Sequence, residues 1–532
     1  MAFNEQQLKV INSDSDKIVC IASAGSGKTT VLLGRINKLI SDGVPADSIL
    51  VLTFTNAAAQ ELTDRFRKQN KGNISPKFCT FHAFCYSLIS SNLKIRSYMG
   101  YKDIPNVGTG EDFIRLWGIT RAVCNVKLSD AKLKGKREDV PEKDRFVYDV
   151  FWKEYKRQMC AANLISFDIM CYDVAQMFID NLDIVNQYKE KYQYVMQDEH
   201  QDSDPTQQAF VESFTNAKLF CCGDPQQMLY RFRGCTNEII KGLAENPEYE
   251  LIKLPHNYRS TRQIVEYSNS IFAKKWKDNP YYIIGESDKN GDPVEFYNAF
   301  PKEISDLVPE AVKMQAAVQS GKSVAILCRT NAEVAELREL FNQLNIPIRG
   351  KADNSNIIGI LKSSIDSEYC VNWLSSLLPN EDYMRFLRIS TINPTMCEEQ
   401  NFIKSFGMKF AKLLNVIYDC RRILSTNDSI FIRISNVIKN LKLSVTINPT
   451  DNQFESLDDG IDYLVNAVEE SVNYGIYIGT IHSVKGLEYD IVHVVGVDGP
   501  SFMTDKNEDE MACYYVACTR AKEHLYIWSE LI

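Results

Sequence analysis

Residues 18–30 read Ile-Val-Cys-Ile-Ala-Ser-Ala-Gly-Ser-Gly-Lys-Thr-Thr, and this stretch decides the fold around it. The four apolar residues at its start predict a short buried strand, and a helix is expected to begin near Thr29. Gly25 and Gly27 lie in the turn between them, where glycine lets successive N–H groups point at phosphate oxygens. The helix N-terminus adds positive potential, Lys28 can reach terminal phosphates, and Thr29 suits magnesium. The stretch therefore predicts a phosphate-binding loop.

This loop departs from the pattern GxxxxGK[ST] at its first position, where Ala22 stands in place of glycine. An ordinary strand–turn–helix with a chance lysine would look similar, so other parts of the chain must decide the chemistry. The residues expected to surround nucleotide phosphates are Ala22, Ser23, Ala24, Gly25, Ser26, Gly27, Lys28, Thr29 and Thr30.

Length and composition describe a large globular protein. At 532 residues the chain is too long for one core and predicts three or four domains. Its hydrophobic content of 45% with 24% charged residues is not that of a disordered chain. No apolar run is long enough to span a membrane and no secretion signal precedes the phosphate loop, so we expect no membrane association and a cytoplasmic location.

Cysteine, histidine and charge set further limits. The fifteen cysteines and six histidines show no metal-ligand spacing, which argues against zinc or iron–sulfur sites and favours reduced, mostly buried thiols. The net charge of −9 excludes a wholly basic surface. It does not exclude a nucleic-acid binder, because a local groove can hold a strand that the rest of the surface repels.

Apolar strands alternate with helical segments along most of the chain, which predicts an α/β fold with two parallel-sheet lobes. Two helical stretches interrupt this rhythm and are expected to be insertions. Aromatic residues in the first of them, at Tyr148, Phe151, Trp152 and Tyr155, have helical spacing and are predicted to be core. The predicted domains are residues 1–85 with 191–256 (first lobe), 86–190 (first insertion), 257–372 with 473–532 (second lobe) and 373–472 (second, short insertion).

A pair of adjacent carboxylates follows the predicted strand that ends at Met196. A phosphoanhydride is hydrolysed when magnesium neutralises the developing charge and a second group orients the attacking water. At the carboxyl end of a strand, Asp198 could bind magnesium while Glu199 orients water. An Asp-Glu pair alone is usually a solvated turn, but the phosphate loop in the same chain favours the catalytic interpretation.

Several further motifs resemble those of the UvrD/Rep/PcrA helicases of superfamily 1. Their shared order along the chain identifies it as similar to that family, because any one of them could occur by chance. The motifs are Phe3-Asn4-Glu5-Gln6-Gln7, Thr53-Phe54-Thr55-Asn56-Ala57-Ala58-Ala59, Thr80-Phe81-His82-Ala83-Phe84, Gly223-Asp224-Pro225-Gln226-Gln227, Tyr230-Arg231-Phe232-Arg233-Gly234, Asn257-Tyr258-Arg259-Ser260, Thr480-Ile481-His482-Ser483-Val484-Lys485-Gly486-Leu487-Glu488-Tyr489 and Tyr515-Val516-Ala517-Cys518-Thr519-Arg520-Ala521-Lys522.

The resemblance implies two RecA-like lobes that use ATP and Mg²⁺. It assigns Gln7, Tyr258 and Glu488 to adenine and ribose, and Gln227 to sensing the γ-phosphate. It also makes Arg259 and Arg520 arginines that reach the γ-phosphate from the second lobe, so that hydrolysis depends on closure of the cleft. With Lys28, Asp198 and Glu199, these two arginines and Gln227 form the expected catalytic set.

The resemblance also implies a binding track for single-stranded DNA. Stacking on aromatic rings grips a strand without reading its sequence, since every base has a π-face. Core packing is the alternative for each of these aromatic residues, and it is favoured more for Phe54 than for Phe232. The DNA-contacting residues expected from the motifs are Phe54, Thr55, Asn56, His82, Tyr230, Phe232, Arg233 and His482.

Three departures from the family pattern bear on function. Thr30 stands where many members carry an arginine near the base, so nucleotide selectivity is expected to be looser. Phe232 replaces a frequent tryptophan. The second insertion is short compared with the family's accessory domain, which makes strand separation a less secure expectation than translocation.

The sequence thus predicts an ATP-dependent DNA helicase or translocase, moving 3′ to 5′ on single-stranded DNA and acting at single-strand/duplex junctions. The alternative is an ATPase or DNA-sensing subunit of a defence or recombination complex with a separate nuclease partner. A catalytically dead DNA-binding scaffold is disfavoured because Lys28, Asp198, Glu199, Arg259 and Arg520 are all present.

Overall fold

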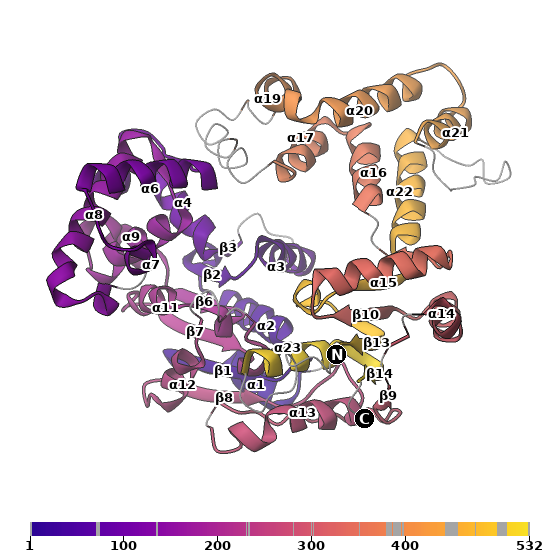
Figure 1. Cartoon of the computed structure of the whole chain (residues 1–532), viewed down its shortest axis with the longest axis horizontal. Coiled ribbons are helices and arrows are strands. Elements are labelled where there is room, and N and C mark those ends of the chain that lie inside the picture. Colours follow the sequence, from indigo (N-terminus) through magenta and orange to yellow (C-terminus); the bar gives the residue numbers. More distant parts are fainter. Residues whose placement is uncertain are drawn as a thin grey trace. The chain divides into compact units, whose positions relative to one another are not determined.

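The computed structural model describes residues 3–70, 75–134, 137–229, 231, 235–279, 281–298, 300–301, 303–349, 352–378, 386, 395, 398–441, 456–473, 475–496 and 508–529. The chain divides into two compact units, whose helices and strands are labelled in Figure 1. The first comprises Met1–Phe81, Asn186–Ser355 and Val468–Ile532, and the second comprises His82–Val185 and Asn356–Ala467.

The first unit contains two six-stranded sheets, and all the strand pairs in them are parallel. In the first sheet the strand order is β3-β2-β6-β7-β1-β8, so the strand that precedes the phosphate loop lies between β7 and β8. The strands of this sheet are β1 (Lys17–Ala22), β2 (Ile49–Thr53), β3 (Lys77–Thr80), β6 (Tyr194–Gln197), β7 (Lys218–Gly223) and β8 (Glu250–Leu254).

Strand β1 is buried on both faces, as a central parallel strand must be. Ile18 and Cys20 pack with α1 (Glu5–Asn12), α2 (Lys28–Ser41) and α3 (Asn56–Gln69). The alternating residues Val19 and Ile21 point to the opposite face, into a core shared with α12 (Asn237–Glu245) and α13 (Arg262–Trp276). The phosphate loop is therefore fixed at the end of a rigid strand.

The second sheet has the order β11-β12-β10-β13-β14-β9. On one face it packs against α14 (Ile304–Gln319) and α15 (Asn331–Gln343), and on the other against α13 and α23 (Glu508–Cys518). Two parallel-sheet lobes, each interrupted by a helical segment, confirm the predicted fold class. The strands are β9 (Glu295–Tyr297), β10 (Val324–Cys328), β11 (Ile348–Arg349), β12 (Ile476–Thr480), β13 (Tyr489–Val495) and β14 (Ala521–Trp528).

The second unit is mainly helical. In its first segment Phe151 and Tyr155 are buried and Tyr148 and Trp152 pack against them, so these aromatics are core, as predicted. The helices of that segment are α4 (Phe81–Ser91), which begins one residue before it, α5 (Leu93–Tyr98), α6 (Gly110–Cys124), α7 (Asp130–Lys134), α8 (Glu142–Ala161) and α9 (Phe167–Ile179). Helix α10 (Asp183–Lys191) begins in this segment and continues into the first unit. Those of the other segment are α17 (Ser367–Ser376), α19 (Glu399–Phe406), α20 (Ala411–Leu424) and α21 (Ile430–Asn440), together with most of α16 (Ala352–Ser363) and of α22 (Leu457–Asn473), whose outer ends belong to the first unit.

Two local details of the structure were not predicted from the sequence. A short parallel pair, β4 (Asn106–Val107) with β5 (Leu164–Ile165), lies within the helical first segment of the second unit. Helix α3 is capped by Thr55, whose Oγ1 accepts a hydrogen bond from the Ala58 N–H, and Asn56 is already the first helical residue. Both features are too short to leave a periodic signal in the sequence.

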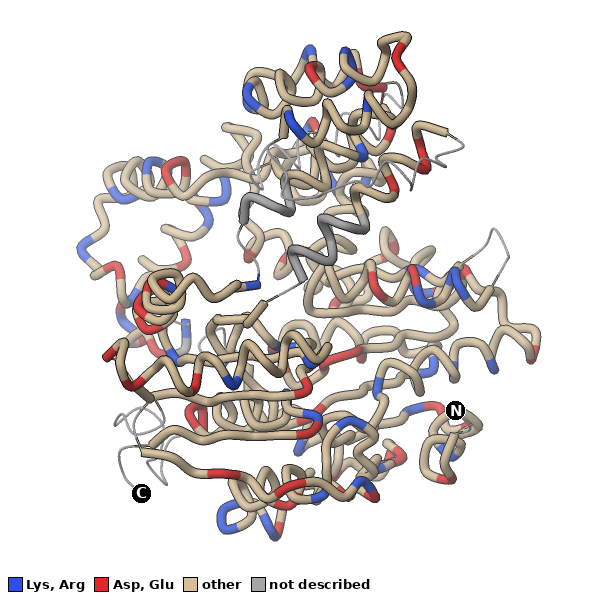
Figure 2. Tube along the Cα trace, turned by 90° about the vertical axis from the view of Figure 1, so that its right-hand side faces the viewer, with Lys and Arg blue, Asp and Glu red and all other residues tan. Residues whose placement is uncertain are grey.

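Charged residues of both signs alternate along the elements visible in Figure 2 and do not gather into one block of a single sign. In the part of the chain that the structure describes, no helix is long and apolar enough to cross a membrane. The cysteines in the same part are free thiols, and most of them are buried, as expected.

Candidate nucleotide-hydrolysis site

The phosphate loop lies between β1 and α2, where the sequence predicted it. Gly25 and Gly27 have φ values of +71° and +81°, which residues with a side chain rarely adopt. Gly27 is the N-cap of α2. A Cβ atom added to Gly25 would lie 2.7 Å from Arg259 Cβ and 2.8 Å from Asn257 Oδ1. The glycine is therefore required both by the turn and by the close approach of the segment that carries Arg259.

Gln7 connects the first helix with the phosphate loop. Its Nε2 donates to the Ser26 carbonyl at 3.0 Å, while its Oε1 accepts from the Asn4 N–H at 3.1 Å in a capping box. The Tyr258 hydroxyl lies 3.5 Å from the same Oε1 atom. The two residues predicted to contact adenine are thus brought together at one side of the loop. The side chain of Thr30, next to the loop, is exposed.

Asp198 and Glu199 follow β6 directly, and the Asp198 N–H donates to the Leu52 carbonyl of the neighbouring strand β2. Burial, with the adjacent Glu199 charge, raises the pKa of Asp198 despite the nearby Lys28. Burial would also raise the pKa of Glu199, but Lys485 and Lys28 outweigh it and hold that pKa below its usual range. The adjacent carboxylates therefore differ in their proton affinity, as two groups with different tasks should.

The ammonium group of Lys28 lies close to the carbonyl of Ala22, at 3.5 Å. Its charge opposes the burial that raises the pKa of Asp198 and of Asp224, and it helps to lower the pKa of Glu199, so it lies among the carboxylates at the carboxyl ends of the central strands. This is the place where ligands bind in open parallel sheets.

Gln227 and Arg520 are joined across the two sheets. Arg520 Nη2 donates to Gln227 Oε1 at 3.0 Å, and Gln227 Nε2 donates to Asp224 Oδ2 at 2.6 Å. The Arg520 side chain is held by the Val516 carbonyl, and only 1% of the residue is exposed. Burial and the nearby Arg259 lower its pKa, although an arginine stays charged in a protein.

Arg259, which the sequence interpretation assigns to the second lobe, has contacts on the sides of both sheets. It follows β8 of the first sheet by five residues and packs against Gly25 of the phosphate loop. Its guanidinium donates to Glu488 Oε2 at 2.7 Å and to the Thr519 carbonyl at 3.2 Å, both from the second-sheet side. Arg259 therefore lies at the junction of the two sheets.

Glu488, which the resemblance assigns to ribose, is held by cations of the protein. Besides its contact with Arg259, its Oε1 lies 3.2 Å from Lys522 Nζ. Burial would raise its pKa, but Arg259 and Lys522 lower it. Its carboxylate thus orients the Arg259 guanidinium.

The side chains of Gln201, Asp202 and Lys485, to which the sequence interpretation gave no role, also join this network. Gln201 Nε2 donates to Glu199 Oε2 at 2.5 Å, and its Oε1 accepts from the Asp224 N–H at 2.9 Å. Lys485 forms an ion pair with Asp202, lies 3.9 Å from Glu199 Oε2 and donates to the Gln227 carbonyl. All three stood inside the quoted motifs or next to them, but their contacts depend on the folded arrangement.

The residues proposed for magnesium fit a site completed by phosphate oxygens. Thr29 is the second residue of α2 and Asp198 is a buried carboxylate with a raised pKa, which a cation would relieve. Among the described residues, no cluster of three His, Cys, Asp or Glu side chains could hold a metal by itself. Magnesium commonly takes only one or two carboxylates and fills its shell with phosphates and water.

Five of the eight predicted DNA contacts lie among the described residues. Phe54 is half-buried, while Thr55 and Asn56 are exposed at the start of α3. His82 lies in the second unit, where its ring packs edge-on against Phe167. His482 is half-buried, and burial with the nearby Arg329 lowers its pKa. The remaining three residues, Tyr230, Phe232 and Arg233, lie outside the described residues.

Two parallel sheets, a phosphate loop on the first and an arginine from the second-sheet side that is hydrogen-bonded to Gln227 define a two-lobed P-loop nucleoside-triphosphatase. Residues 3–102 and 116–248 match the UvrD/REP helicase N-terminal domain, and residues 252–355 and 359–530 match the UvrD-like helicase C-terminal domain. The chain belongs to the UvrD/Rep family of DNA helicases and is an ATP-hydrolysing enzyme.

Relatives match over nearly the whole chain. A probable DNA helicase II homolog of Mycoplasma capricolum is 25% identical, over 98% of this chain and 84% of that protein. The ATP-dependent DNA helicase PcrA of Staphylococcus epidermidis is 26% identical, over 98% and 83%. A putative ATP-dependent DNA helicase of Bacillus subtilis is 25% identical, over 99% and 78%. These alignments run over 601 to 614 positions, more than the 532 residues here, so the relatives contain inserted segments that this chain lacks.

Proposed function

We propose that the protein moves along single-stranded DNA in the 3′ to 5′ direction, hydrolyses ATP with Mg²⁺ at the site described above and opens duplexes at single-strand junctions. The observation that carries this proposal is the hydrogen bond between Arg520 and Gln227, which ties a cation of the second sheet to the phosphate-sensing side of the first. A cytoplasmic location accords with a DNA substrate.

In this proposal the phosphate-loop N–H groups and Lys28 bind the ATP phosphates. Thr29 and Asp198 hold magnesium, which neutralises charge on the phosphates when bound. Glu199 orients the attacking water, since its lowered pKa keeps it ionised and able to accept a proton. Arg259 and Arg520 neutralise charge that develops on the γ-phosphate, an effect worth about 10³–10⁵ in rate for arginine fingers.

On the DNA side, Phe54, Thr55, Asn56, Tyr230, Phe232, Arg233, His82 and His482 remain the proposed contacts. The direction of movement rests on the resemblance to the family, since fold alone does not set it. The matches to DNA helicases over nearly the whole chain do not favour the alternative of a sensing subunit with a nuclease partner.

One experiment tests the proposal. ATP turnover and strand separation are measured together on duplexes with a 3′ or a 5′ single-stranded tail, for the protein and for Lys28→Ala. We expect turnover to be stimulated by single-stranded DNA. We expect unwinding only from the 3′ tail, because a motor that moves 3′ to 5′ on the tailed strand travels toward the duplex only there. Lys28→Ala should lose both, since nothing replaces its ammonium at the phosphates.

Unwinding only from the 5′ tail would contradict the direction. Turnover that single-stranded DNA fails to stimulate would contradict the motor function, and normal turnover in Lys28→Ala would contradict the site.

A further inference from the structure

The turn Asn257–Ser260 connects β8 of the first sheet to α13 and carries Arg259 at its tip. We propose that Asn257 is a positioning residue for hydrolysis, which locks this turn to the phosphate loop and so fixes Arg259 relative to the γ-phosphate. The resemblance gave roles to its neighbours Tyr258 and Arg259 and none to Asn257.

The Asn257 side chain joins the two segments with both ends of its amide. Its Nδ2 donates to the carbonyl of Ala24 in the phosphate loop at 2.8 Å. Its Oδ1 accepts from the N–H groups of Arg259 at 2.7 Å and of Ser260 at 2.8 Å. Only 4% of Asn257 is exposed, so these bonds do not compete with bulk water.

Backbone contacts reinforce this connection. The Tyr258 N–H donates to the Gly25 carbonyl at 2.9 Å, one residue beyond the carbonyl that Asn257 holds. Gly25 has no side chain there, and an added Cβ atom would meet the Arg259 Cβ atom at 2.7 Å. Two consecutive carbonyls of the phosphate loop are therefore bound by the turn that carries the arginine.

A neighbouring segment, residues 286–287, which we call the strap, holds the other side of the turn. The Asn257 N–H donates to the Glu286 carbonyl at 2.7 Å, and the Ser287 hydroxyl donates to the Ser260 carbonyl at 2.7 Å. The Ser260 hydroxyl in turn donates to the Ala521 carbonyl, next to Arg520. Because the strap and the second sheet hold the turn from behind, the Asn257 amide and the Tyr258 N–H together set its distance from the phosphate loop, and of the two only the amide belongs to a side chain.

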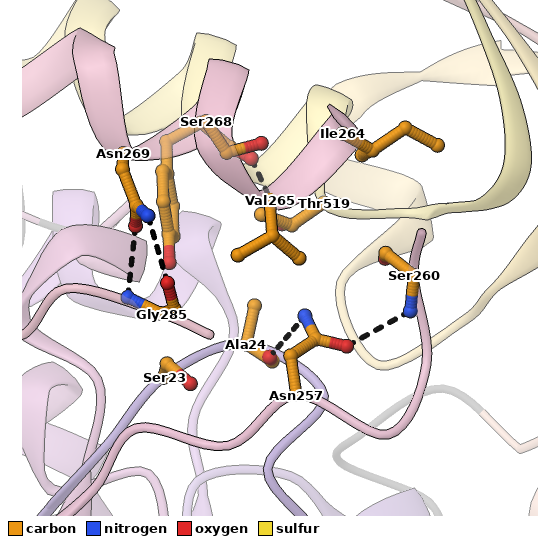
Figure 3. A pocket seen from close by; sticks show the side chains of 11 residues that line it. Ser23, Ala24, Asn257, Ser260, Ile264, Val265, Ser268, Asn269, Gly285 and Thr519 are labelled. Atoms are coloured by element: carbon orange, nitrogen blue, oxygen red, sulfur yellow. Dashed lines mark hydrogen bonds between the residues drawn. The ribbon is translucent and has the colours of Figure 1, made fainter. Parts of the chain in front are cut away.

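Figure 3 shows the Asn257 amide between Ala24 and Ser260, with a second amide, that of Asn269, bound to Gly285. Both asparagines line a small cavity of about 10 Å³ behind the phosphate loop. That volume admits about one water molecule and no nucleotide, so it offers no separate ligand site. Asn269 serves as a control, because its amide also hydrogen-bonds a backbone carbonyl and a backbone N–H, those of Gly285, without contacting the phosphate loop.

The experiment compares Asn257→Asp with Asn269→Asp in the full chain. Each change replaces an amide N–H group that donates to a carbonyl by a carboxylate oxygen. The negative oxygen repels the carbonyl oxygen. For Asn257→Asp we expect kcat for ATP to fall about 10- to 100-fold, the cost of displacing a catalytic group by about 1 Å. The KM for ATP should rise by no more than about 10-fold, because Lys28 and the loop N–H groups still bind the phosphates.

A second readout separates positioning from folding. The preference for a non-hydrolysable ATP analogue over ADP should fall about 10-fold in Asn257→Asp, while ADP affinity stays within about 2-fold, because only the γ-phosphate senses Arg259. Asn269→Asp should keep both values. The Asn257→Ala variant introduces no new charge and is measured in the same way, with melting temperatures recorded for all.

Unchanged kcat and analogue preference in both Asn257 variants would overturn the inference, and so would an equal loss in Asn269→Asp. The inference rests on the proposed role of Arg259, which Arg259→Ala tests separately. Normal turnover in Arg259→Ala would refute that role. A defect in Arg259→Ala without one in the Asn257 variants would refute only the positioning by Asn257.

Discussion

At the scale of single residues, His493 shows how burial sets a protonation state far from the nucleotide site. It lies in β13 with 4% of its surface exposed, and its Nδ1 accepts from the Trp528 indole N–H at 3.1 Å. Its ring also stacks on Tyr526, with the ring centroids 4.6 Å apart. Burial lowers the pKa of His493 to about 3. The imidazole is therefore neutral in the folded protein at every pH of interest.

The unfolded chain should bind a proton at this histidine below about pH 6.5, whereas the folded chain does not. The contribution of His493 to stability is thus complete above about pH 6.5 and is lost as the pH falls toward 3. Both proteins should lose free energy of unfolding when the pH falls from 7.5 to 5. We expect this loss to be about 1–2 kcal/mol smaller for His493→Phe than for the unaltered protein. At pH 7.5 the variant should be less stable by about 1–3 kcal/mol, because the Trp528 N–H loses its acceptor. Urea unfolding at both pH values measures this, and parallel losses in the two proteins would contradict it.

The chemistry of the site was predictable to the extent that it depends on residue type within a local motif. Lys28, Asp198 and Glu199 were found because each follows an apolar strand, and parallel strands present their carboxyl ends at one edge. Asn257 and Gln201 were missed because an amide has no fixed role until its two partners are known. Here those partners are backbone groups distant in sequence, Ala24 for one and Asp224 for the other.

At the scale of helices and strands, a close contact between α16 and α17 defines part of the second unit. A Cβ atom added to Gly359 would lie 1.9 Å from the Trp373 ring, which cannot shift as easily as the end of a flexible chain. Buried strands such as β1 and β10 were predictable from apolar runs. This helix contact was not, because periodicity reveals a helix face but not the element packed on it.

We therefore expect Gly359→Ala to destabilise the second unit by about 1–3 kcal/mol through overpacking. Gly242 in α12 has nothing within 4 Å of its added Cβ atom, so Gly242→Ala is the matched control. That change should be neutral or stabilising by up to about 1 kcal/mol, since alanine favours a helix. Thermal unfolding and limited proteolysis of both variants measure the difference. Equal stability of the two variants would contradict the close helix contact.

For the molecule as a whole, contacts at the nucleotide site also connect the two sheets. Arg520 reaches Gln227, Arg259 reaches Glu488 and Lys485 reaches Asp202. The two lobes were predictable from the order of strands and helices. The position of Arg259 at their junction was not, because the motif that carries it begins just after a strand of one sheet and continues into a helix that packs on the other.

Of the two ion pairs among these connections, that of Lys485 with Asp202 is the more shielded from water, with side chains 13% and 1% exposed. Removing one partner of a buried pair leaves an uncompensated charge, a loss of about 3–5 kcal/mol. We expect Lys485→Met to be destabilised by that order and to hydrolyse ATP slowly, because Glu199 also loses the ammonium 3.9 Å away. The double variant Asp202→Asn, Lys485→Met removes both charges and should recover most of the stability but little of the activity. Denaturant midpoints and ATP turnover of the single and double variants measure the two effects.

If the double variant is no more stable than Lys485→Met, the pair does not couple the sheets. If its turnover recovers with its stability, Lys485 acts on folding alone and not on Glu199, the carboxylate that we propose orients the attacking water.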